Sequence, residues 1–138
     1  MRIISGIYRG RKIHPPTNLP VRPTTDYAKE GLFNVLNNLI DFEETSVLDL
    51  FAGTGSITFE FVSRGVPSVL AIDIERRCVE FINKTSEQLG MEGVSVRRMN
   101  VKVFLRLAYQ KFDLVFADPP YGMEGIALLP GKILEADV

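Results

Sequence analysis

Three residues in one short segment are suited to chemistry on an amine. The segment Asp118-Pro119-Pro120-Tyr121 joins a carboxylate, a rigid backbone and an aromatic ring. The lone pair of an exocyclic base amine is delocalised into the ring, so this amine is a poor nucleophile. A carboxylate and a proline-fixed carbonyl can accept hydrogen bonds from its two hydrogens and turn the lone pair toward an incoming methyl group. Tyr121 offers a face for stacking an extruded base. A rigid turn without a ligand is the alternative.

A glycine-containing turn forms a second candidate site. Residues Asp49–Gly55 read Asp-Leu-Phe-Ala-Gly-Thr-Gly, between an apolar run and a predicted helix. Glycine lets a ligand approach the backbone closely, and the start of a helix presents free N–H groups. Asp73 stands 20 residues after Gly53, at the end of the next apolar run. A carboxylate there can accept hydrogen bonds from ribose hydroxyls or cap the following helix. The pattern favours a nucleotide or nucleoside site over a plain turn.

The spacing of the glycines bears on which nucleotide is bound. A dinucleotide fingerprint has a third glycine where this chain has Thr58, and no phosphate-binding G-x-x-x-x-G-K-[ST] loop is present. These residues disfavour NAD, although a nicotinamide-dependent oxidoreductase stays open as an alternative.

Alternating strands and helices must position these sites. Strands separated by helices of 10 to 15 residues predict βαβ units, and hence an α/β, doubly wound, mostly parallel Rossmann-like sheet. The carboxyl ends of parallel strands share one edge, so the sites should meet there. The expected strands are Val47–Phe51, Ser68–Ile74, Val94–Met99 and Phe112–Ala117. The expected helices are Tyr27–Ile40, Ser56–Arg64, Glu75–Leu89 and Val101–Tyr109.

The pattern stops after four strands and the chain ends within a helical segment. We therefore expect a C-terminally shortened sheet, in which the strand Phe112–Ala117 is an exposed apolar edge.

The N-terminal segment has a distinct charge. Residues 1–22 sum to +5 without an acid, whereas the whole chain has a formal charge of −1. Arg2–Tyr8 and Arg11–His14 predict a β-hairpin that turns at Arg9-Gly10. Residues 15–23 hold four of the eight prolines and predict an extended linker. We expect residues 1–23 to form a nucleic-acid-contacting arm and residues 24–138 the sheet domain, although a solvated hairpin is an alternative for the arm.

Composition narrows the class of protein. The chain has 138 residues, 46% of them hydrophobic and 24% charged, which is typical of one globular domain. One cysteine and one histidine exclude an internal disulfide and a Cys/His zinc cluster, and we expect no metal. No apolar run is long enough for a membrane span, so we expect no membrane contact and a cytoplasmic protein.

Further strings extend along nearly the whole chain and resemble the bacterial 16S rRNA guanine-N2 methyltransferase family, within the class I S-adenosylmethionine-dependent methyltransferases. These strings are Met1-Arg2-Ile3-Ile4-Ser5-Gly6, Arg9-Gly10-Arg11, Arg22-Pro23-Thr24-Thr25-Asp26, Leu32-Phe33-Asn34, Asp49–Gly55, Ser63-Arg64-Gly65 and Asp118–Tyr121.

The resemblance implies methyl transfer from S-adenosylmethionine to the N2 amine of a guanine in 16S rRNA, free or within a small-subunit particle. Asp118 and Pro119 would bind the amine, and Tyr121 would stack on the base. Asn100 departs from the family, which usually has an acid there; its amide oxygen can still accept from the adenine amine. The implied cofactor residues are Asp49, Phe51, Gly53, Gly55, Asp73, Ile74, Asn100 and Val101. The implied RNA contacts are Arg9, Arg11, Lys12, Arg22 and Tyr121. A DNA or other RNA base-amine methyltransferase and a non-catalytic RNA-binding fragment remain alternatives.

Overall fold

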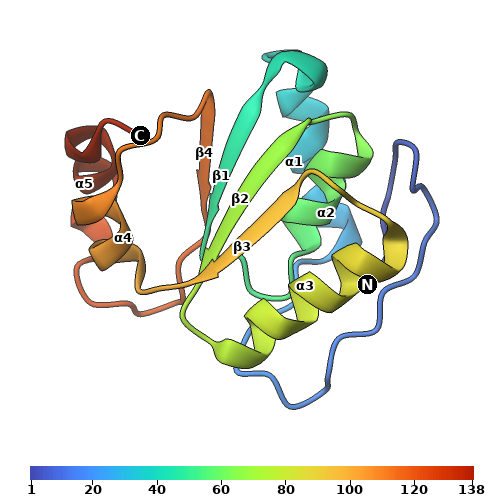
Figure 1. Cartoon of the computed structure of the whole chain (residues 1–138), viewed down its shortest axis with the longest axis horizontal. Coiled ribbons are helices and arrows are strands. Elements are labelled where there is room, and N and C mark those ends of the chain that lie inside the picture. The colour runs from blue at the N-terminus through green and yellow to red at the C-terminus, as the bar shows by residue number, and fades with distance from the viewer.

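Four parallel strands form one sheet in the computed structural model, which describes residues 1–138 (Figure 1). The strands are β1 (Ser46–Leu50), β2 (Ser68–Asp73), β3 (Val94–Arg98) and β4 (Leu114–Ala117). Their order in the sheet is β3-β2-β1-β4. The chain moves outward from β1 to β3 and then crosses to β4, on the other side of β1. This arrangement confirms the predicted doubly wound α/β sheet, with its switch point between β1 and β4.

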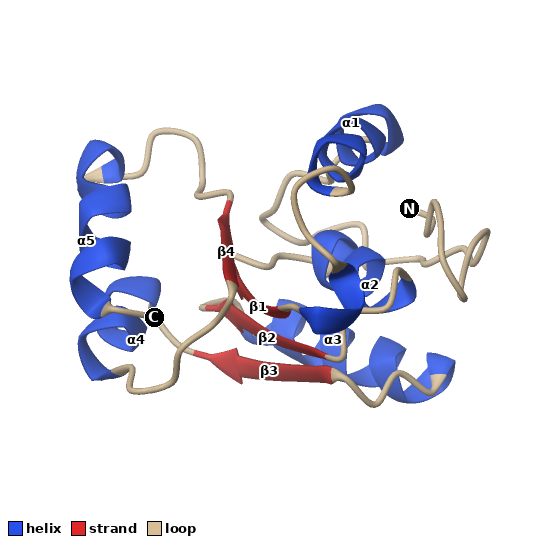
Figure 2. Cartoon of the chain, turned by 90° about the horizontal axis from the view of Figure 1, so that it is seen from above, coloured by secondary structure: helices blue, strands red, loops and turns tan.

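Helices cover both faces of the sheet (Figure 2). One layer holds α1 (Asp26–Leu36), α2 (Ser56–Ser63) and α3 (Arg76–Leu89), and the other holds α4 (Val101–Leu107) and α5 (Leu129–Ala136). Short 3-10 turns cover Phe42–Glu44 and Ile126–Leu128. No helix is long and apolar enough to cross a membrane.

The two layers enclose separate cores. Successive side chains of a strand point to opposite faces, so Val47 and Val69 pack with the α1–α3 layer while Leu48 and Leu70 pack with α4 and α5. Because both faces of the central strands are covered, β1 and β2 read as nearly continuous apolar runs. In β1 and β2 the polar residues lie at or next to the strand ends, where a site can form.

Several elements are shorter than the sequence predicts. Phe51 has a left-handed φ of 59°, so β1 ends at Leu50. Helix α1 ends at Leu36, and residues 37–39 form turns. Ala108 has extended dihedral angles, so α4 ends at Leu107. Glu75 lies outside α3, where its side chain caps the helix by accepting from the Arg77 amide.

The predicted N-terminal β-hairpin is reduced to one antiparallel bridge, between Arg2 and Lys12. The prediction of two strands is wrong because of contacts with a distant part of the chain. The amides of Ile4, Ser5 and Tyr8 donate to side chains of α2, rather than to a partner strand. Antiparallel strands cannot continue without these donors.

Strand β4 lies at the edge of the sheet and pairs only with β1. All four of its residues are half-buried, as expected for an edge strand. Helix α5 ends at Ala136, and Asp137 follows in a left-handed conformation, so the last residues lie beyond the helix rather than within it.

Candidate functional site

Three strands bring their C-terminal polar residues to one level of the sheet. Leu50 of β1 is in register with Ile72 of β2 on one side and with Ala117 of β4 on the other. The next residues along β2 and β4 are Asp73 and Asp118, so these acids leave the sheet on either side of the turn that follows β1. Asp49 lies one residue before the end of β1. Residues far apart in the chain therefore form one acidic group.

Asp49 is buried, with a relative exposure of 1%. Its carboxylate accepts a hydrogen bond of 2.6 Å from the Thr58 hydroxyl on α2. Burial raises the pKa of Asp49 to about 7, and the Asp73 and Asp118 carboxylates add to this rise, whereas the Thr58 bond opposes it. A cation placed among these three acids would relieve their mutual repulsion. The site therefore suits a positively charged ligand.

The glycine turn is tied to the end of β2. The Gly53 amide donates to one oxygen of Asp73 at 2.8 Å, and the Glu75 amide donates to the other oxygen at 2.9 Å. Asp73 thus holds the turn and the start of α3 together. The cap of α3 itself is Glu75, and each Asp73 oxygen keeps a second lone pair for another donor.

Gly55 ends the turn and begins α2, with a φ of 84°. A Cβ at this position would lie 2.9 Å from the side chains of Ile82 and Phe59. Both the left-handed backbone and the close packing require glycine. Helix α2 can therefore approach the sheet closely enough for Thr58 to reach Asp49.

The segment after β4 is open to solvent. Asp118 is exposed, Pro119 is half-buried, and the Tyr121 ring is 93% exposed. The guanidinium carbon of Arg22 lies 5.8 Å from the centre of the Tyr121 ring, within the range of a cation–π contact. The structure therefore brings together Arg22 and Tyr121, which are far apart in the chain.

The linker crosses the same region. Val21 lies beside the glycine turn, because a Cβ on Gly53 would be 3.9 Å from its side chain. Arg77 of α3 donates to the Asn18 carbonyl at 3.3 Å. Val21 and Arg77 were not among the predicted site residues, since nothing in a proline-rich stretch indicates which surface it follows. The linker borders the site from α3 to Tyr121.

Residues after β2 and β3 have different environments. The Asn100 side-chain oxygen accepts from the Lys102 and Val103 amides, at 2.9 and 3.3 Å, as the N-cap of α4. This oxygen is occupied by the helix, contrary to the expectation that it is free for an adenine amine. Val101 is buried in the α4–α5 core, which leaves only its backbone for a ligand. Ile74 is 59% exposed at the end of β2 and is accessible to a ligand.

The basic residues of the arm are accessible. Arg9, Arg11 and Lys12 are all exposed, and none of them forms an ion pair. Arg2 instead pairs with Asp26, at 2.8 Å. Three free cations thus lie close together in the sequence, which suits an anionic partner.

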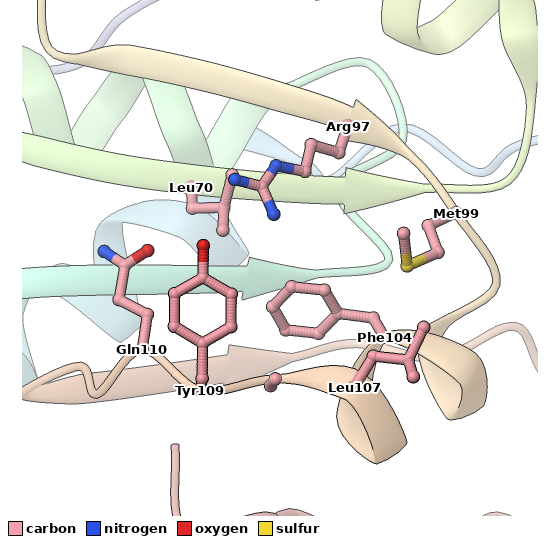
Figure 3. A pocket seen from close by; sticks show the side chains of 8 residues that line it. Leu70, Arg97, Met99, Phe104, Leu107, Tyr109 and Gln110 are labelled. Carbon is pink, nitrogen blue, oxygen red and sulfur yellow. The ribbon is translucent and has the colours of Figure 1, made fainter.

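A separate cavity of about 140 Å³ lies between α4 and the β2–β3 side of the sheet (Figure 3). Leu70, Met99 and Phe104 give it an apolar floor, and Arg97 and Tyr109 extend their side chains across it. None of the predicted site residues lines this cavity. The candidate site is therefore the acidic edge of the sheet and not this cavity.

Two polar residues of α2 were likewise not among the predicted site residues. Thr58 was noted only because it stands where a dinucleotide-binding fingerprint has its third glycine, yet its hydroxyl donates to Asp49. Glu60 is fully buried within Ser56–Ser63, a helix whose residues are all buried. A carboxylate in so apolar a segment is itself a signal, because a buried acid requires partners.

Comparisons with known proteins bear on the whole chain. A family model described as conserved hypothetical protein 95 matches residues 1–135. Ribosomal RNA small subunit methyltransferase D of Buchnera aphidicola subsp. Baizongia pistaciae is 34% identical over 121 residues, which cover 88% of this chain and 61% of that protein. The protein of the same name from Escherichia coli K12 is 35% identical over 121 residues, with 88% and 60% covered.

The fold agrees with these relatives. The solved structure of the Escherichia coli protein yhhF superposes with a TM-score of 0.86 at 33% identity, covering 99% of this chain and 73% of that one. This chain spans about 60% of the length of the curated relatives. The resemblance drawn from the motifs is confirmed, and the match over nearly every residue shows that this chain belongs to the conserved hypothetical protein 95 family.

Proposed function

We propose that this chain transfers a methyl group from S-adenosylmethionine to the N2 amine of a guanine in 16S rRNA. One observation carries the proposal: Asp118-Pro119-Pro120-Tyr121 follows β4, directly across the switch point from the acidic, glycine-containing turn after β1. The proposed acceptor for an amine and the proposed site for a cationic nucleoside are therefore adjacent. The names of the curated relatives, ribosomal RNA small subunit methyltransferase D, support the substrate class.

The donor set fits S-adenosylmethionine, which has a sulfonium and an ammonium group and would supply the methyl group when bound. Asp49 and the turn containing Gly53 and Gly55 would hold its cationic end, since the acids there repel one another until a cation is present. Asp73 would accept from the ribose through its remaining lone pairs. Ile74 and Phe51 would border the adenosine. Asn100 and Val101 would contribute mainly through the backbone, because the Asn100 oxygen caps α4 and the Val101 side chain is buried.

The target amine would bind to the segment after β4. The Asp118 carboxylate and the Pro119 carbonyl would accept hydrogen bonds from the two amine hydrogens and so orient the lone pair of the nitrogen. The carboxylate would also stabilise the positive charge that develops on this nitrogen. Pro119 has no N–H that could compete for the same acceptor. Tyr121 would stack on the base, and the Arg22 guanidinium lies over the ring of Tyr121.

We further assign residues 1–23 as an RNA-contacting arm and residues 24–138 as the cofactor-binding domain. Arg9, Arg11 and Lys12 would contact phosphates, which position an RNA without reading its sequence. Arg22 would act nearer the base, as its position over Tyr121 suggests. The substrate would be 16S rRNA, free or within a small-subunit particle.

Methyl transfer to 16S rRNA, with radiolabelled S-adenosylmethionine and mass spectrometry of the digested nucleosides, tests the proposal. We expect N2-methylguanosine from the wild-type chain and none from Asp118→Ala, whose cofactor affinity in calorimetry should match that of the wild type. Glu92→Ala, an exposed acid before the start of β3 and so at the opposite edge of the sheet, is the control. Turnover by Asp118→Ala would contradict the assignment of that acid. Binding of NAD in place of S-adenosylmethionine would favour the oxidoreductase, and a label on DNA or on another base amine would contradict the substrate.

A further inference from the structure

The backbone of the N-terminal arm is bound to one surface of α2, which we call the arm anchor: Glu60 and Ser63. The Glu60 carboxylate is fully buried and accepts from the Ile4 amide at 2.9 Å and from the Ser5 amide at 3.0 Å, one at each oxygen. Ile4 and Ser5 lie 56 and 55 positions before Glu60 in the chain. Glu60 thus accepts the two amides that have no partner within the arm, beyond its short antiparallel pairing at Arg2 and Lys12.

Ser63 makes three further bonds to the arm. Its hydroxyl donates to the Ser5 carbonyl at 2.6 Å and accepts from the Tyr8 amide at 3.0 Å. Its carbonyl accepts from the Ile7 amide at 2.8 Å. Gly6 permits this contact, because a Cβ there would lie only 1.8 Å from the Ser63 carbonyl oxygen. The fit between arm and helix is therefore specific.

A buried group of charges holds the anchor in place. Glu60 pairs with Arg64 at 2.8 Å and with Lys29 of α1 at 3.5 Å. Lys29 is 1% exposed and donates to the Arg2 carbonyl at 2.6 Å and to the Ser56 hydroxyl at 3.0 Å. Ser56 directly follows the glycine turn. One network therefore connects the arm, α1 and α2 at the end of the glycine turn.

An arm held in this way is ordered before it meets a partner. A free arm would have to lose backbone entropy on binding, which weakens affinity, whereas a bound arm has already lost it on folding. Arg9, Arg11 and Lys12 directly follow the anchored residues and remain exposed. The anchor therefore determines where these three charges lie relative to the rest of the molecule.

We propose that Glu60 and Ser63 are positioning residues for RNA binding: they hold the arm against α2 so that Arg9, Arg11 and Lys12 meet the RNA backbone together. This inference rests on the proposed function. It also gives a role to the segment Ser63-Arg64-Gly65, whose resemblance to the family has no catalytic explanation.

The test uses Ser63→Ala in the full chain, because removal of Glu60 would leave Lys29 buried without its partner and threaten folding. Two arm bonds are lost, and the Ser63 carbonyl bond remains. We expect affinity for in vitro transcribed 16S rRNA to fall about tenfold. The KM for RNA should rise, while kcat and the affinity for S-adenosylmethionine stay unchanged. Hydrogen exchange at the amides of residues 4–8 should become faster.

Ser86→Ala is the matched control. Ser86 is also buried in a helix, but its hydroxyl donates to the Ile82 carbonyl within α3 and does not contact the arm. RNA affinity and arm exchange should match those of the wild type. A second variant, Gly6→Ala, should displace the arm entirely and lower RNA affinity more than Gly10→Ala. Gly10 has a similar φ of 83° but no atom within 4 Å of an added Cβ.

The outcomes separate the two proposals. Wild-type affinity for RNA in both Ser63→Ala and Gly6→Ala would overturn the role of the anchor, as would equal losses in Ser63→Ala and Ser86→Ala. Failure of the wild-type chain to bind 16S rRNA would overturn the proposed function itself. Reduced affinity together with faster exchange, in the two arm variants only, supports the anchor.

Discussion

At the scale of single residues, Asp49 makes stability depend on pH. Its pKa is about 7 in the folded chain, against an ordinary value of 3.8. Between these values only the folded chain keeps the proton, so the free energy of unfolding falls as the pH rises from about 4 to about 7. The full difference corresponds to about 4 kcal/mol at most. We expect Asp49→Asn to lose this dependence in urea unfolding at pH 5 and pH 8. Glu92→Gln, an exposed acid, should keep the wild-type slope; an unchanged slope in Asp49→Asn would contradict the burial argument.

At the scale of elements, Asn100 determines where α4 begins. Its side-chain oxygen accepts from two amides of the first turn, which have no partner within the helix. We expect Asn100→Ala to lower the free energy of unfolding by about 1 kcal/mol, and Asn100→Asp to restore it. Urea unfolding measures both changes. Asn34→Ala on the exposed side of α1 should lower stability little or raise it, since alanine favours helix. Equal stability of Asn100→Ala and the wild type would mean that the cap is not formed.

At the scale of the whole molecule, charge is divided between an arm of positive charge and an acidic sheet edge. Replacing Arg9, Arg11 and Lys12 with glutamine should weaken binding to 16S rRNA and reduce the slope of log affinity against log salt by about 2 to 3. Filter binding over a range of salt concentrations measures both. Arg76→Gln removes one charge on α3 that already pairs with Glu80, and its slope should stay near that of the wild type. A triple variant with the wild-type slope would place the RNA contact on another surface.

The sheet and its acidic edge could be predicted because their signals are local. Apolar runs in β1 and β2 report burial on both faces, and an acid at the end of each run must lie at the carboxyl edge of a parallel sheet. The sequence alone therefore predicts that Asp49, Asp73 and Asp118 lie at this edge. The errors at element ends arose from single backbone angles, such as that of Phe51, and from caps such as Glu75.

The N-terminal arm shows where local signals end. Its sequence alternates well enough for a hairpin, and only the tertiary structure places Glu60 and Ser63 within reach of its amides. The same holds for the position of Arg22 over the Tyr121 ring. By itself the sequence determined the order of strands and helices, the family and the residues at the strand ends, since these depend on neighbouring residues and periodicity. The tertiary structure alone decided the position of the arm and the linker, because polar backbone groups bind whichever partners folding brings near them.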